Sequence, residues 1–167
     1  MTSRTLQFYY TNDLHSHFEN WSKVSSYLKD KKRMHELQGT PYLLLDLGDH
    51  SDKVHPMTEG MVGKGNVQLL NDLQYDYATI GNNEGITFSK KELEALYTEA
   101  SFEVLVANLY HQDGTRPAWA APYKIHELNG VQVGIIGVTI PYEQFYSLLG
   151  WKIDSPYDFL QAMIDEV

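Results

Sequence analysis

The chain has 167 residues, of which 43% are hydrophobic and 13% aromatic, and it carries a formal net charge of −9. This length and composition support one domain with a buried core rather than a disordered tail, and the negative charge argues against a nucleic-acid partner, because nucleic-acid phosphates attract basic proteins. Since the sequence has no cysteine and no apolar run near the roughly 18 residues of a membrane span, it excludes disulfides, thiolate metal sites and membrane insertion, and we expect a cytoplasmic protein.

Short apolar runs and helical segments alternate along most of the chain. Five runs bounded by turn residues are typical of β-strands, and they occupy residues 5–10, 41–47, 75–80, 102–108 and 131–138. The spacing of apolar residues predicts helices over 20–38, 65–74 and 89–100. The last of these begins at Ser89, and Glu92 completes the pattern of a capping box. This alternation predicts βαβ units and a mostly parallel sheet.

The last part of the sequence changes in character. Asn129-Gly130 lies between two alternating stretches, which predicts a β-hairpin that we expect to join the sheet. Ser155-Pro156 begins an amphipathic segment that runs to Val167 without a stop signal. We therefore expect residues 1–167 to form a single α/β domain that is the N-terminal piece of a longer chain.

Polar side chains that can bind metals follow three consecutive predicted strands. They are Asp13, His15 and His17 after the first strand, Asp49, His50 and Asp52 after the second, and Asn82, Asn83 and Glu84 after the third. Ligands of open α/β sheets gather beyond the carboxyl ends of the strands, so these loops should converge. Such oxygen and nitrogen donors suit divalent cations better than a nucleophilic triad, because no Ser or Cys lies in an elbow-like turn.

Three motifs in these loops resemble the signature of the calcineurin-like metallophosphoesterases. Asp13-x-His15, Gly48-Asp49 and Gly81-Asn82-x-Glu84 are similar to the family motifs Asp-x-His, Gly-Asp and Gly-Asn-His-Glu, which hold two metals. The phrases TNDLHSH, LLLDLGD, VANLY and GIIGVT most resemble the N-terminal catalytic region of the 5′-nucleotidase branch. The resemblance implies the N-terminal part of an αββα sandwich, with a mostly parallel sheet and an added β-hairpin.

The resemblance also implies the roles of individual residues. Asp13 and His15 would bind a first metal, Asp49 would bridge both metals, and Asn82 would bind the second. The two divalent ions, which can be Mn, Zn, Fe or Mg, lie about 3.5–4 Å apart in such sites, and the hydroxide that they share attacks phosphorus in line. The activity implied is a metallophosphatase that releases phosphate from nucleotides or related small phosphate esters. Bound cations would let an acidic chain accept such a substrate.

Two positions depart from the family pattern. Asn83 stands where the family has its general-acid His, and Ile86 stands where an Asp commonly orients that His. An amide can donate a hydrogen bond but not a proton, and the loss of a general acid costs roughly 10²–10⁴ in rate. We therefore treat Asn83 as a candidate catalytic contact and His50 as a candidate replacement for the acid. The alternative function is a catalytically weakened module that binds metal and nucleotide as a sensor or regulator.

Structural roles compete with these assignments. Asp13 and Asp49 can each cap a turn or a helix, and Asn83 can hold a tight turn in the αL conformation. Three histidines can be solvated loop residues or outer contacts of the site: His17, His50 and His55. The family's later His ligands do not occur in this sequence, which leaves too few ligands for two metals. We expect little phosphatase activity from residues 1–167 alone, and self-association through exposed apolar sheet surface.

Overall fold

The computed structural model describes residues 5–167, and its centre is a five-stranded parallel sheet in the order β1-β2-β3-β4-β6. The strands of this sheet are β1 (Gln7–Thr11), β2 (Tyr42–Asp46), β3 (Tyr77–Ala78), β4 (Glu103–Leu105) and β6 (Ala120–Ala121). The helices are α1 (Phe18–Gln38), α2 (Pro56–Gly60), α3 (Lys64–Asp72), α4 (Lys90–Leu96), α5 (Glu143–Leu148) and α6 (Pro156–Glu166), and a π-helical segment η1 (Asn83–Thr87) precedes α4. The predicted α/β fold with a mostly parallel sheet is confirmed.

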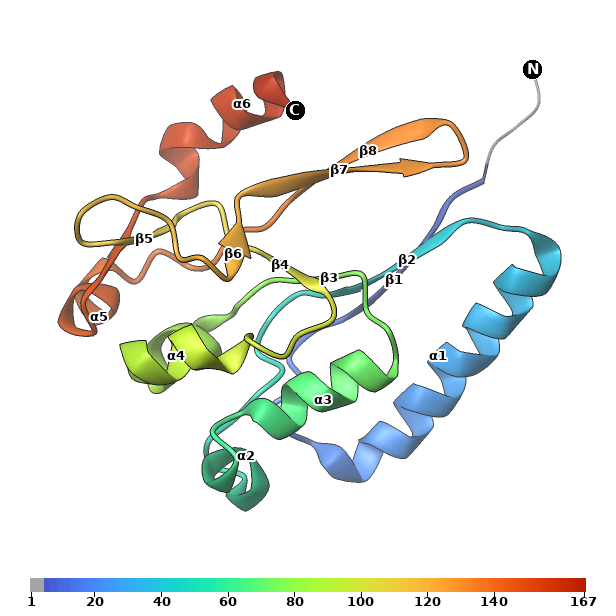
Figure 1. Cartoon of the computed structure of the whole chain (residues 1–167), viewed down its shortest axis with the longest axis horizontal. Helices are drawn as coiled ribbons and strands as arrows, with labels where there is room; N and C mark the ends of the chain where they lie inside the picture. The colour runs from blue at the N-terminus through green and yellow to red at the C-terminus, as the bar shows by residue number, and fades with distance from the viewer. Residues whose placement is uncertain (1–4) are drawn as a thin grey trace.

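The sheet has an apolar layer on each face, because successive side chains of a strand point in opposite directions. Leu44 and Val104 belong to the main core, together with Leu28 of α1 and other side chains of α3 and α4. Their strand neighbours Leu43 and Leu105 belong to a second, smaller cluster. Figure 1 shows α1, α3 and α4 on one side of the sheet, and the hairpin and α6 on the other. Both faces of the sheet are therefore occupied, while its carboxyl edge carries the loops.

The predicted hairpin is present but does not join the five-stranded sheet. Strands β7 (Tyr123–Leu128) and β8 (Val131–Ile136) pair with each other alone, and the turn residues Asn129 and Gly130 have φ angles of 52° and 72°. Leu128, Val133 and Ile135 pack on the second cluster, so the hairpin crosses the face of the sheet instead of extending its edge. The expectation that this pair joins the sheet is wrong, because side-chain burial on the face determines its position.

The predicted helix starts are reproduced more closely than the short elements. Ser89 and Glu92 form the predicted capping box of α4, and α6 follows Ser155 as expected. The antiparallel pair β5 (Leu109–His111) and β9 (Trp151–Ile153) was not predicted, and neither were α2, α5 and β6. Elements of two to six residues are too short to show a hydrophobic period. Tertiary contacts therefore determine whether these elements form. One such contact is the stacking of His111 on Trp151, with ring centroids 5.2 Å apart.

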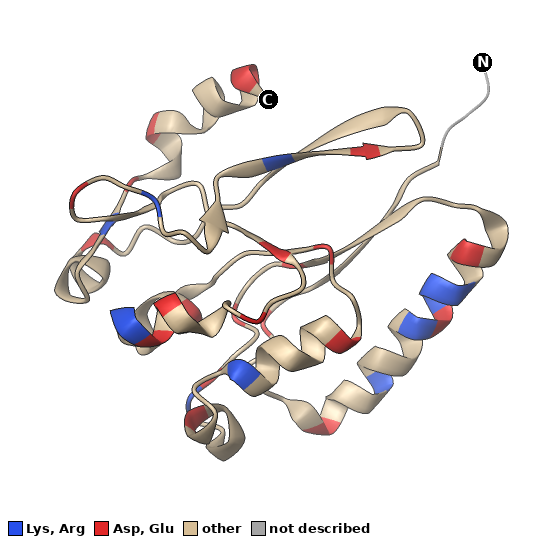
Figure 2. Cartoon of the chain, in the orientation of Figure 1, with Lys and Arg blue, Asp and Glu red and all other residues tan. Residues whose placement is uncertain are grey.

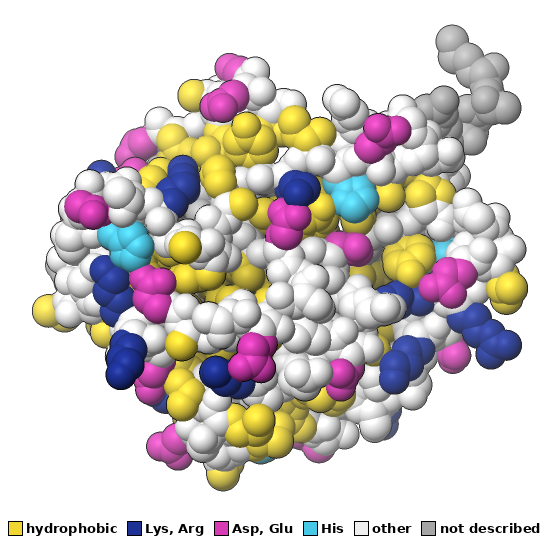
Figure 3. Space-filling view, viewed as in Figure 1, with side chains coloured by type: hydrophobic (Ala, Val, Ile, Leu, Met, Phe, Trp, Pro, Cys, Tyr) yellow, Lys and Arg dark blue, Asp and Glu magenta, His cyan; other side chains and the backbone are white. Residues whose placement is uncertain are grey.

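The surface combines mixed charges with several apolar side chains. Figure 2 shows Lys and Arg along α1 and at the starts of α3 and α4, with acidic residues interspersed among them. Figure 3 shows hydrophobic side chains at the surface near α6, where Tyr157 is 97% exposed. None of the helices within residues 5–167 is both long enough and apolar enough to span a bilayer.

Candidate metal centre

The loops that follow β1, β2 and β3 begin at one edge of the sheet. The three strands are parallel and in register, so that Thr11 pairs with Asp46, and Asp46 pairs with Ala78. Hydrogen bonds between the loops extend this register beyond the strands. The amide of His15 donates to the carbonyl of Asp49 over 2.9 Å. The first and second candidate motifs are therefore held side by side by their own backbones.

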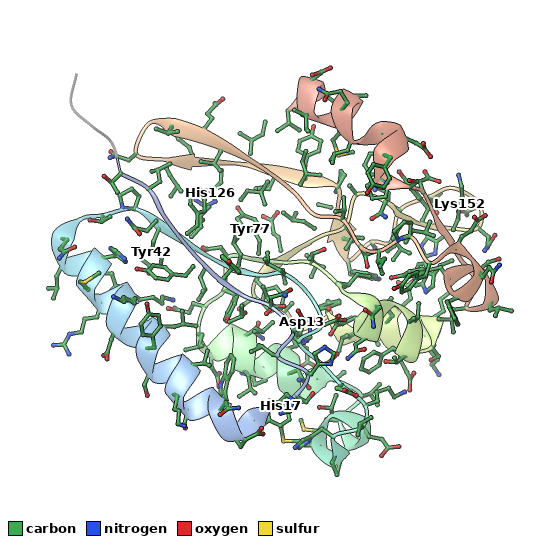
Figure 4. All side chains as sticks on the ribbon, turned by 180° about the vertical axis from the view of Figure 1, so that it is seen from behind. Asp13, His17, Tyr42, Tyr77, His126 and Lys152 are labelled. Atoms are coloured by element: carbon green, nitrogen blue, oxygen red, sulfur yellow. The ribbon has the colours of Figure 1, made fainter. Side chains whose placement is uncertain are left out.

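Three of the four predicted metal ligands share one small space. One carboxylate oxygen of Asp13, one ring nitrogen of His15 and one carboxylate oxygen of Asp49 all lie within 4.8 Å of one another. Figure 4 shows Asp13 at the end of β1, and His17 farther along, at the start of α1. Two carboxylates and an imidazole at this separation form a donor set that suits Mn²⁺, Zn²⁺, Fe²⁺ or Mg²⁺. These side chains therefore fit a divalent cation.

The fourth predicted ligand, Asn82, lies against the same carboxylate. Its side-chain amide lies 3.2 Å from Oδ2 of Asp49, and in the orientation that satisfies both groups its N–H donates to that oxygen. Burial raises the pKa of Asp49, and the hydrogen bond from the amide of Asn83 opposes this shift. Turned the other way, the amide would present its oxygen beside Asp49, where both side chains could bind one cation.

The backbone at the site adopts conformations that side chains rarely tolerate. The φ angle is 53° at Asp13, 44° at His15 and 53° at Asp49, all in the left-handed region. Such residues cluster at functional sites, where the surrounding structure holds them in place. Gly81 lets the third loop approach, because a Cβ there would overlap Oδ1 of Asp49. The positions of the candidate ligands therefore depend on contacts between loops more than on local preference.

Glu84 ties the second and third loops together beneath the candidate ligands. Its side chain is fully buried and accepts hydrogen bonds from the amides of Asp49 and Gly81, each over 2.9 Å. Its other oxygen accepts from the amide and the hydroxyl of Ser51 over 2.8 and 2.7 Å. Burial acts to raise the pKa of Glu84, but the nearby His50 and these hydrogen bonds outweigh it and hold the pKa below its ordinary value. Glu84 is therefore an ionised anchor for the loops.

Replacing Glu84 with glutamine should destabilise the fold strongly. The amide group of glutamine cannot accept from all four donors, so at least one buried N–H or O–H would lose its partner. Breaking a buried charged network in this way costs about 3–5 kcal/mol in the free energy of unfolding, measurable by urea denaturation. Glu99→Gln is the matched control, because Glu99 pairs with Lys64 at the surface and should change stability by about 1 kcal/mol or less. Equal losses in both variants would contradict the anchoring role.

Asn83 contacts two candidate ligands at once. Its backbone amide donates to Oδ1 of Asp49 over 2.7 Å, and its side-chain Nδ2 lies 2.8 Å from Nδ1 of His15. Asn83 begins the π-helical segment η1 and is not in the left-handed region, so the interpretation as an αL turn is wrong. Burial acts to lower the pKa of His15, but Asp52 and Asp13 outweigh it and raise that pKa. Asn83 is therefore in direct contact with the cluster of candidate ligands.

The three other histidines near the predicted ligands, His17, His50 and His55, occupy different environments. His50 is only 1% exposed, and its Nε2 lies 3.1 Å from the hydroxyl of Tyr97. Of the two alternatives for His50, the solvated loop residue is therefore wrong, and the outer contact fits because Nδ1 lies 3.8 Å from Oε1 of Glu84. His17 is solvated and pairs with Glu19 over 2.8 Å. His55 caps α2, where its ring accepts from the amide of Met57.

Sequence reasoning gave no individual role to three residues that build the site. Glu84 appeared only as part of a motif, and Ser51 and Asp52 follow the second motif directly. Their position next to predicted ligands was the available signal. What the sequence could not show is the direction of each side chain, since Ser51 and Glu84 are buried and Asp52 faces His15.

Comparison with known proteins identifies the family. No family model matches the sequence. The chain is 48% identical over 163 residues to the uncharacterized metallophosphoesterase YunD of Bacillus subtilis (strain 168), and this match covers 97% of the chain and 35% of that protein. The chain belongs to the metallophosphoesterases.

Two further comparisons place this metallophosphoesterase beside the nucleotidases. It is 28% identical over 182 residues to the 5′-nucleotidase of Bos taurus, covering 97% of this chain and 31% of that protein. The structure of the NAD nucleotidase NadN of Haemophilus influenzae has a TM-score of 0.81 at 20% identity, covering 96% of this chain and 31% of that one, which shows a shared fold. The metallophosphoesterase chain thus spans about a third of the length of the relatives it matches.

Proposed function

We propose that this metallophosphoesterase hydrolyses phosphoesters and releases phosphate from nucleotides or related small phosphate esters. The observation that best supports this proposal is the meeting of Asp13, His15 and Asp49 within 4.8 Å at the edge where three parallel strands end. The kinship with metallophosphoesterases and 5′-nucleotidases supports a hydrolase of this general class. We further propose nucleotides as the substrate and two divalent cations as the cofactors.

Each polar side chain of the cluster has a part in this function. Two divalent cations, when bound, would supply the positive charge that activates the attacking water and neutralises the phosphoryl oxygens. Asp13 and His15 would hold one cation, Asn82 would hold the other, and Asp49 would contact both. Asn83 can donate a hydrogen bond to a phosphoryl oxygen, but it cannot protonate the leaving group. Buried His50 would support Tyr97 and Glu84 rather than meet the substrate.

Removal of divalent metal tests the proposal directly. We expect the full-length protein that carries this sequence to release phosphate from AMP or from an aryl phosphate when a divalent metal is bound. Without the metal, the carboxylate and imidazole side chains of the site lack the positive charge needed to activate water. Excess EDTA should abolish this release, and added Mn²⁺ or a similar ion should restore it, as measured by a phosphate assay. EDTA should remove most of the activity, since the metal supplies several kcal/mol of charge stabilisation. Undiminished turnover in EDTA would refute a metal-dependent mechanism.

A second function, a weakened sensor that binds metal and nucleotide, is favoured by one observation. Asn83, which replaces the family's general acid, contacts His15 and Asp49 instead of offering a proton. A sensor should bind AMP without cleaving it and should still cleave activated aryl phosphates, because these need no protonated leaving group. Comparable turnover of both substrates would favour the hydrolase.

A further inference from the structure

The two ring nitrogens of His15 face different surroundings. Nε2 lies 3.4 Å from Oδ1 of Asp13, inside the candidate metal centre. Nδ1 lies on the outer side, 3.4 Å from Oδ2 of Asp52 and 2.8 Å from Nδ2 of Asn83. A neutral imidazole carries one proton, and only the nitrogen without it can bind a cation. If Nε2 binds the cation, the proton must be on Nδ1 and needs an acceptor there.

We propose that Asp52 is the positioning residue that keeps His15 in the tautomer able to bind metal, an inference that rests on the proposed function. A carboxylate accepts hydrogen bonds and does not donate them. Oδ2 of Asp52 therefore stabilises the form of His15 that carries its proton on Nδ1. That form leaves the Nε2 lone pair directed toward Asp13 and the cation. Asp52 acts through His15 and is not itself a ligand.

The carboxylate of Asp52 is fixed by the loops that it joins. Its Oδ1 accepts from the amide of Val54 over 2.9 Å, which leaves Oδ2 for His15. Its backbone amide donates to the hydroxyl of Ser16 over 2.8 Å. Ser16 directly follows His15, is 2% exposed, and also contacts the hydroxyl of Thr58 over 2.7 Å. The imidazole and its acceptor are thus attached to the same buried network, so their relative position is set before any cation arrives.

Asn83 has the opposite preference at the same nitrogen. Its Nδ2 is a donor, so the contact with Nδ1 favours the tautomer that carries the proton on Nε2, facing Asp13. An amide can rotate and present its oxygen instead, whereas a carboxylate offers only acceptors. While no cation is bound, Asp13 also favours the tautomer with the proton on Nε2, because its Oδ1 lies 3.4 Å from Nε2 and can only accept. Asp52 is therefore the group that selects the metal-binding form. Metal binding should also require the amide of Asn83 to turn.

Mn²⁺ affinity of the full-length protein, measured by titration calorimetry, tests this inference without relying on turnover. Loss of an outer partner of a metal-binding His typically weakens metal affinity 10–100-fold. We therefore expect the Mn²⁺ affinity of Asp52→Ala to be about 10–100-fold weaker than that of the wild-type protein. Asp52→Asn should lose as much, because its oxygen would stay with Val54 and its NH₂ group would face Nδ1. Glu19→Gln is the matched control, since Glu19 faces Nδ1 of His17 over 2.8 Å outside the cluster and should leave affinity unchanged.

Two further measurements separate positioning from simple structural support. The unfolding midpoint should stay near the wild-type value in Asp52→Asn, which keeps the hydrogen bond to Val54. NMR of ¹⁵N-histidine in the Zn²⁺-loaded protein should show the His15 proton on Nδ1, and this signal should weaken in Asp52→Ala. Unchanged Mn²⁺ affinity in Asp52→Asn would overturn the positioning role. Failure of the wild-type protein to bind Mn²⁺ would instead overturn the proposed function itself.

Discussion

Asp49→Asn is expected to remove nearly all phosphatase activity while leaving the fold intact. The carboxylate of Asp49 shares a space of 4.8 Å with the ligand atoms of Asp13 and His15 and lies 3.2 Å from the amide of Asn82, so it would contact both cations. The amide retains the shape of the side chain but loses the negative charge between two positive ions. Loss of several kcal/mol of charge stabilisation lowers the rate by about 10³-fold or more, measured as kcat/KM for an aryl phosphate.

Although Asp49→Asn should lose activity, its stability in the absence of metal should not fall. The negative charges of Glu84 and Asp13 add to the effect of burial in raising the pKa of Asp49, so removing its charge relieves repulsion in the metal-free protein. The unfolding midpoint in EDTA should therefore stay equal or rise. Asp113→Asn is the control, because Asp113 accepts its hydrogen bonds from Thr115 in an exposed turn. Activity within about threefold of wild type in Asp49→Asn would contradict the bridging role, since a shared cation ligand is worth far more.

The sequence was sufficient to predict the main layers of the fold, because long periodic segments carry their own signal. The helix that became α1 and the strand that became β2 were predicted to within a few residues, since each buries one face or both. Pairs such as β5 with β9 have three residues each and depend on Trp151 packing among distant aromatic rings. Their existence is set by tertiary contacts that no local window contains.

In the candidate site, too, the sequence predicted some features and not others. The rule that ligands gather beyond the carboxyl ends of parallel strands was enough to bring Asp13, His15 and Asp49 together. It could not show that Asp52 faces His15, or that Glu84 lies beneath the loops. Those directions follow from left-handed backbone angles and from hydrogen bonds between loops about 35 residues apart in sequence, such as the bond from Asp49 to Glu84. Residue type predicted which groups meet, and only the folded chain shows how they are oriented.

Asn83→His should accelerate the cleavage of alkyl phosphates such as AMP in the full-length protein. The backbone amide of Asn83 already anchors this position to Asp49, so the new imidazole would begin from a fixed point beside the cluster. A general acid contributes roughly 10²–10⁴ when the leaving group is a poor one. We expect a gain near the lower end, about 10²-fold, because Ile86 cannot orient the ring as the family's Asp does.

The leaving group gives this prediction its internal control. Aryl phosphates leave without protonation, so kcat/KM for them should change little in Asn83→His, and the ratio of the two substrates should shift toward AMP. Asn20→His is the matched variant, because Asn20 is exposed on α1 and a new imidazole there should alter neither substrate. If Asn83→His is neutral or harmful toward AMP, another group already supplies the proton. In that case the site is complete without the family's acid.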